Sequence, residues 1–212
     1  MEKHYNSNVI NDAKEILQDI CKTPEEKELF LRWYSIAEPI LLHEEYQKRK
    51  MMEHHPNLSV FSHCLIDSFL VFLKALRKRS ENFIAQNAAI AGLLHDFYTH
   101  AWRLSDDVIE LGTPYCDLVY PNPVHISNVF EKHAFTHPIE SLENSRIYFP
   151  ELLNERIEDS ILYHMYPLTR PLLRYPKYPE GRMLTWVDKT ASTGAIKNSN
   201  ELKKFMGISR SR

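Results

Sequence analysis

The sequence predicts an all-α fold, a bundle of helices built around one buried segment. Three observations support this prediction. Only five of the 212 residues are glycine, which argues against a turn-rich β fold. Many apolar residues recur at the three- and four-residue spacing of helices. Residues 88–94 are all apolar or small and run directly into His95 and Asp96, so we expect a helix that is buried on every side.

Composition and charge exclude several classes of protein. A net charge of −2 gives no general attraction to duplex nucleic acid or to an anionic membrane. No apolar run reaches membrane-spanning length, and the polar N-terminal residues contain no signal-peptide core. The three cysteines form no recognisable spacing pattern, and such a sparse, odd set fits a reducing compartment. We therefore expect a soluble, cytoplasmic protein.

Residues 1–57 are predicted to form N-terminal helices, of which the first lies within 1–22. Thr23, followed by Pro-Glu-Glu, is a good helix start. The helix that follows should continue to Lys50, with a kink or a division at Pro39. The His-His-Pro-Asn segment near the end of this region is a break. These helices either pack on the core or form a homodimer interface.

Residues 58–196 are predicted to form the main domain. A helix over 58–79 places His63 on its apolar face. Ser80 then caps the buried helix. Prolines and a glycine make residues 104–135 irregular, which is typical of a lid or a substrate-shaping loop.

Three further helices are expected. One begins at His137, because a proline and a glutamate follow in its first turn. The next carries an apolar stripe that His164 continues. After a proline-broken segment, the last helix, over 182–196, presents Asp188 on the same face as its apolar residues. Residues 197–212 form a basic tail.

Six ionisable residues face the predicted interior: His63, His95, Asp96, His137, His164 and Asp188. Burying a carboxylate is costly unless it is paired or binds a metal. A single buried histidine is most simply a hydrogen-bonded core residue, but six such residues together are better explained by a metal site. Imidazole and carboxylate ligands suit Fe, Mn, Zn or Ni. Four further histidines are expected on the surface: His4, His43, His54 and His55.

The order of these residues resembles a known superfamily. His63, the His95-Asp96 pair and Asp188 are similar to the H…HD…D signature of HD-domain metal-dependent phosphohydrolases, in particular a largely uncharacterised bacterial subgroup. The surrounding segments also match, over 61–63, 93–98, 137–144, 163–169 and 187–189, so that the resemblance covers about residues 58–196. It implies an all-α HD-domain bundle with a metal site at its centre.

The resemblance also implies a divalent metal cofactor with two ions. In the superfamily a four-residue set binds one ion, here His63, His95, Asp96 and Asp188. Members with two more histidines bind a second ion, and His137 and His164 occupy those places. Asp96 would bridge the ions and, with His95, serve as a catalytic residue. A metal-activated hydroxide would attack phosphorus in a nucleotide-like phosphoester or phosphoanhydride.

The expected phosphate contacts depart from the family pattern. Many members have a lysine shortly after the HD pair, whereas this chain has Arg103 in that region. Arg103 is a predicted replacement, and the other substrate-binding candidates are Lys189, Arg146, Arg170 and Arg174. For each of them the alternative is a solvated surface charge. Three histidines in or near the 104–135 region are candidate substrate contacts: His100, His125 and His133.

Two alternatives stay open. One is a mononuclear nucleotidase for nucleoside monophosphates, in which His137 and His164 contact phosphate instead of metal. The other is a metal-stabilised regulatory or binding module without turnover. Oxidative cleavage by a mixed-valence iron pair also occurs among HD relatives, but nothing in this sequence favours it.

Overall fold

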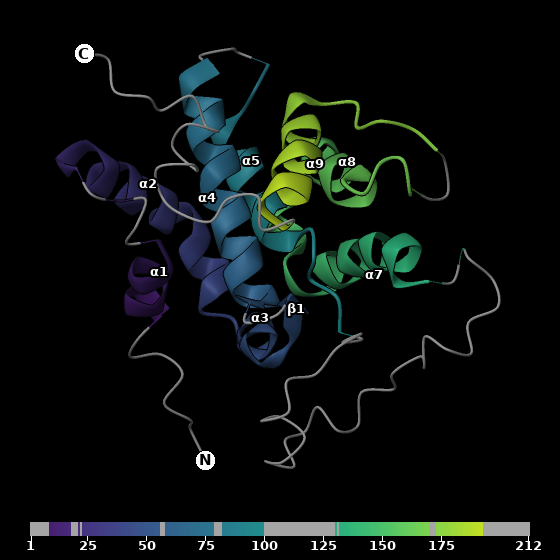
Figure 1. Cartoon of the computed structure of the whole chain (residues 1–212), viewed down its shortest axis with the longest axis horizontal. Helices are drawn as coiled ribbons and strands as arrows, with labels where there is room; N and C mark the ends of the chain where they lie inside the picture. Colours follow the sequence, from purple (N-terminus) through teal and green to yellow (C-terminus); the bar gives the residue numbers. More distant parts are fainter. Residues whose placement is uncertain are drawn as a thin grey trace.

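The structure, a computed structural model, describes residues 9–17, 21, 23–55, 58–78, 82–99, 130, 132–169 and 173–192. This part of the chain is mostly helical, which confirms the predicted all-α class (Figure 1). Its strands are β1 (Glu53–His55) and β2 (Leu58–Ser59), a small antiparallel pair at the predicted break. None of the described helices is both long enough and apolar enough to span a membrane.

The N-terminal region begins with α1 (Val9–Leu17) and α2 (Pro24–Leu41). The predicted start of α2 is confirmed, since Thr23 and Glu26 form a reciprocal capping box. Pro39 does not divide this helix, which ends two residues later. The expected continuation to Lys50 is wrong. The backbone is extended at His43, whose side chain caps α3 (Glu44–Gln47), and η1 (Lys48–Met51) follows.

Helices α4 (Val60–Lys78) and α5 (Ala85–Leu94) form the centre of the bundle and pack against each other. They approach closely at Gly92, where an added Cβ would lie 2.5 Å from the Cα of Ser68. The hydroxyl of Ser68 accepts a hydrogen bond from Trp33 Nε1 (2.9 Å) and donates one to the carbonyl of Ala89 (2.6 Å). Small residues therefore bring α5 against α4, as expected from the run at 88–94.

The second half of the bundle consists of α7 (His133–Tyr148), η5 (Pro150–Leu152), α8 (Glu155–Tyr163) and α9 (Pro179–Ser192). Helices α7, α8 and α9 all pack against α5, and α9 also packs against α4 (Figure 1). The predicted start of α7 at His137 is wrong, because the helix begins four residues earlier and includes Pro138. Pro138 removes one backbone hydrogen bond, but the helix continues through it, and its side chain is buried.

One apolar core joins the two halves. Ala13, Leu17 and Trp33 from the N-terminal helices belong to the same buried cluster as Leu70 and Leu93. A second, smaller cluster contains Met52, Val60, Cys64 and Tyr98, so Cys64 packs among apolar side chains as expected. Several predictions lie outside the described residues: the cap at Ser80, most of the irregular region 104–135 and the tail 197–212. The end of that irregular region was predicted wrongly, because residues 133–135 belong to α7.

Candidate metal centre

The structure brings the six predicted ligands together in the interior of the bundle, and each of them is buried. They reach this point from helix faces and helix ends: His63 from α4, His95 and Asp96 from the turn after α5, His137 from α7, His164 from the turn after α8, and Asp188 from α9. Because α5 is buried from Asn87 to Leu94, its C-terminal end places two polar residues in the middle of the protein.

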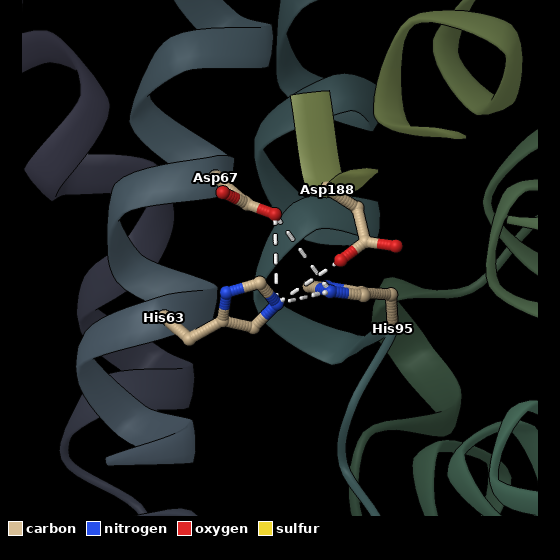
Figure 2. Close-up of side chains that lie close together, drawn as sticks. All are labelled: His63, Asp67, His95 and Asp188. Atoms are coloured by element: carbon tan, nitrogen blue, oxygen red, sulfur yellow. Dashed lines mark hydrogen bonds and ion pairs between the residues drawn. The ribbon is translucent and has the colours of Figure 1, made fainter. Parts of the chain in front are cut away.

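The first histidine pair consists of His63 and His95, whose Nε2 atoms lie 3.1 Å apart (Figure 2). The Oδ1 atom of Asp188 lies 3.4 Å from Nε2 of His63. Figure 2 shows these side chains converging from α4, α5 and α9. Their ligand atoms are close enough to one another to bind a single metal ion.

The second histidine pair consists of His137 and His164, and its Nε2 atoms also lie 3.1 Å apart. The Oδ1 atom of Asp96 lies 3.2 Å from Nε2 of His137 and 3.6 Å from Nε2 of His164. These three residues form another group that can hold a metal ion.

Asp96 lies between the two pairs. Its Oδ1 faces the second pair, whereas its Oδ2 lies 3.6 Å from His63 Nε2 and 3.7 Å from His95 Nε2. The two oxygens of one carboxylate are thus directed to different pairs of imidazoles.

Three of the four histidines are oriented by the backbone through their outer ring nitrogen. The Nδ1 atoms of His95, His137 and His164 lie 2.9, 2.8 and 2.7 Å from the carbonyl oxygens of Gly92, His133 and Ile161. A carbonyl can only accept, so each Nδ1 carries the proton. In the neutral ring Nε2 then presents a lone pair towards the centre, which is the usual arrangement of histidine ligands.

This tautomer leaves the second pair without a proton between its rings. In the neutral rings two Nε2 lone pairs would face each other at 3.1 Å, with Oδ1 of Asp96 3.2 Å from His137 and 3.6 Å from His164. Such an arrangement is repulsive unless a cation, either a metal ion or the proton that the raised pKa of His137 favours beside Asp96, lies among the three atoms. The residues present therefore fit a metal ion.

The pKa values of the first histidine pair also favour a bound cation. Burial lowers the pKa of His95 to about 4. Burial acts in the same direction on His63, but the carboxylates of Asp67, Asp188 and Asp96 outweigh it and raise its pKa to about 9. Neighbouring imidazoles in one pair are thus driven to opposite protonation states, whereas a bound cation would let both act as neutral ligands.

Two residues near the centre were not predicted from the sequence. Asp67 follows His63 by one helical turn, and its carboxylate is fully buried beside the first pair. The signal that could have found it is an aspartate at position i+4 from a ligand, on the same face of an apolar helix. His54 was expected on the surface, and this is wrong. It is half-buried, its ring stacks on His63, and its Nδ1 lies 3.7 Å from Oδ2 of Asp96.

The predicted phosphate-binding residues that the structure describes are engaged in other contacts. Lys189 is exposed and donates to the carbonyl of Tyr166, while Arg146 is exposed and forms an ion pair with Glu158, with Nε 3.0 Å from Oε1. Arg174 pairs with the buried Asp159. Arg103 and Arg170 lie outside the described residues. A role in substrate binding stays a prediction for all of them.

Comparisons with known proteins give no assignment. No protein-family model matches the chain, and neither a curated protein nor a solved structure matches it. The resemblance to HD-domain phosphohydrolases therefore stays a prediction that depends on the order of the residues themselves.

Proposed function

We propose that the buried centre holds two divalent transition-metal ions and that the protein is a metal-dependent phosphohydrolase of the HD-domain type. Its substrate would be a nucleotide-like phosphoester or phosphoanhydride. We place this activity in the cytoplasm, because the sparse cysteines fit a reducing compartment.

The orientation of Asp96 is the observation that supports two ions rather than one. Its Oδ1 lies 3.2 Å from His137 and its Oδ2 lies 3.6 Å from His63. A carboxylate that binds a single ion has its coordinating oxygen or oxygens directed to one group of ligands. Here Oδ1 completes a group with His137 and His164, whereas Oδ2 lies 3.6 Å from His63 Nε2 and 3.7 Å from His95 Nε2.

The donor set also limits which metals fit. Imidazole and carboxylate favour Fe, Mn, Zn or Ni over metals that need thiolates. Cys64 is close enough to His95 and Asp96 to join them. Burial, however, raises the pKa of its thiol well above the ordinary value, and its side chain packs in an apolar cluster with Met52, Val60 and Tyr98.

A pair of divalent ions supplies a water of lowered pKa and neutralises the charge of a phosphoryl group. The chain contributes the positions of the ligands. Backbone carbonyls hold the rings of His95, His137 and His164, and Asp96 joins the two groups. No serine or cysteine nucleophile is needed for this chemistry.

The test combines metal analysis with an activity screen. The full-length protein is purified without chelators, its metal content is measured by mass spectrometry, and nucleoside mono-, di- and triphosphates and an aryl phosphate are assayed. We expect about two equivalents of metal and hydrolysis that a chelator abolishes and added metal restores.

Each alternative has its own outcome in this test. About one equivalent of metal with activity on nucleoside monophosphates would favour the mononuclear nucleotidase. Bound metal without hydrolysis of any phosphate would favour the regulatory module. Protein that binds no divalent metal at all would contradict the proposal.

A further inference from the structure

The inference concerns Asp67, which neither the predicted ligand set nor the proposed mechanism uses. Its side chain is completely buried on α4. Neither of its carboxylate oxygens has a hydrogen-bond partner within the described residues. An aspartate in such a place is costly unless a cation lies beside it.

The carboxylate of Asp67 points to the interior of the first histidine pair. Its Oδ2 lies 3.6 Å from Nε2 of His63 and 4.0 Å from Nε2 of His95 (Figure 2). Together with Asp188 these residues form a buried group whose ligand atoms all lie within 4.8 Å of one another. Asp67 therefore faces the position at which Nε2 of both imidazoles and Oδ1 of Asp188 also converge.

The ring nitrogen that Asp67 approaches distinguishes two roles. A carboxylate that only orients a metal-binding histidine accepts a hydrogen bond from the nitrogen that does not bind the metal. In this centre that outer nitrogen is Nδ1, and for His95 it is already bonded to the carbonyl of Gly92. Asp67 lies on the Nε2 side of both rings. This is the place of a ligand.

We propose that Asp67 is a metal ligand, which makes the first position, at the first histidine pair, a site of two imidazoles, Asp67 and Asp188. This inference rests on the proposed function in so far as it requires the centre to bind divalent metal. Its consequence is that the first position has two carboxylates of its own and a third close by, Asp96, whose Oδ2 lies 3.6 Å from His63 Nε2, whereas the second has a share of Asp96 alone among the described carboxylates. Because ligand charge strengthens the binding of a divalent cation, the first position binds its ion more tightly.

The test is a calorimetric titration with Mn²⁺ of the metal-free, full-length protein, carried out on the wild type and on Asp67→Asn. The amide keeps the size of the side chain and removes its charge. We expect two affinities in the wild type. In the variant the tighter Mn²⁺ affinity should weaken by at least about tenfold, which is the smallest effect typical of replacing a residue that hydrogen-bonds a metal ligand. The weaker affinity should change by less than about twofold.

Asp159→Asn is the matched control. Asp159 is also a buried aspartate, but it pairs with Arg174 and accepts a hydrogen bond from the backbone N–H of Lys177, away from the centre. We expect this variant to lose stability and to keep both metal affinities.

Thermal unfolding separates a ligand from a purely structural carboxylate. If Asp67 binds metal, the metal-free Asp67→Asn protein should be at least as stable as the wild type, because a buried carboxylate without a hydrogen-bond partner has been removed, together with a buried ion pair to His63 that must be desolvated. With saturating Mn²⁺ the order should reverse, since the wild type gains more from binding. An ion pair between Asp67 and His63 with no metal role predicts a less stable variant under both conditions.

Two results would overturn the inference, and they differ from a failure of the proposed function. Unchanged affinities in Asp67→Asn, or a loss of stability that is the same with and without Mn²⁺, would exclude Asp67 as a ligand while leaving the metal centre intact. A wild-type protein that binds no Mn²⁺, Fe²⁺, Zn²⁺ or Ni²⁺ would instead contradict the proposed function itself.

Discussion

The two histidine pairs have the same spacing but very different surroundings. In both pairs the Nε2 atoms lie 3.1 Å apart. The first pair is held between α4 and α5, the most central helices, and lies within 4.0 Å of oxygens from Asp67, Asp96 and Asp188. The second pair comes from α7 and α8 and has Asp96 alone within that distance among the described carboxylates.

This comparison shows that similar geometry does not make two positions equivalent. The imidazoles set the shape of each group, but the carboxylates set the charge that a cation encounters, and charge strongly affects affinity. The first position should retain its ion during dialysis, and the second should lose its ion first. The two positions should also respond differently to substitutions, which gives four ways to test the comparison.

Asp96→Ala should have the largest effect, because it removes the one side chain that both positions share. We expect hydrolysis to fall by well over a hundredfold, and both ions to be lost on dialysis. Metal content and activity measured on the same preparation are the appropriate readouts. An active variant that retained both equivalents would refute the assignment of the site.

His164→Ala should affect the second position alone. We expect the retained metal to fall from about two equivalents to about one, with loss of most of the activity and no change in the tighter affinity. The matched control is His43→Ala, a histidine that caps α3 and lies outside the centre; it should lose about 1 kcal/mol of stability and no metal. Equal loss at both positions would show that they do not bind independently.

Gly92→Ala should disturb the first position and spare the second. The new Cβ would lie 2.5 Å from the backbone of Ser68, and α4 would have to move away from α5. Alanine gains about 1 kcal/mol of helix propensity, but overlap with backbone costs up to about 3 kcal/mol. We therefore expect a net loss of roughly 2 kcal/mol in urea unfolding, with a weaker tight site. Gln86→Ala, at an exposed position of α5, should change neither.

The sequence predicted the fold class and the convergence of the six ligands because both depend on local pattern. The low glycine content and helical periodicity require helices, and an apolar run that ends in His95-Asp96 places these residues inside. The order of His63, the His95-Asp96 pair and Asp188 along the chain then resembled the signature of a metal-binding superfamily. Neither step needed the packing of one helix on another.

The features that the sequence did not predict depend on tertiary contacts. Asp67 lies in the same helix as His63, but nothing in the spacing shows that α5 and α9 surround it with ligands rather than with water. Pro138 reads as the start of a helix, although packing keeps it inside α7. His54 reads as a surface residue because it lies in a break between helices, yet the β1–β2 pair turns it over His63.

His54→Ala should have the smallest effect on metal of the four. The ring of His54 stacks on His63 with 4.1 Å between centroids, and its Nδ1 lies 3.7 Å from the same Asp96 oxygen that faces the first pair. It contributes one more imidazole at the edge of a position whose His63 ring already has the carboxylates of Asp67, Asp96 and Asp188 within 4.0 Å. Its loss should weaken the tight Mn²⁺ affinity by less than about tenfold, below the effect of Asp67→Asn. A larger loss than that of Asp67→Asn would show that contacts at the edge, rather than carboxylate charge, distinguish the first position from the second.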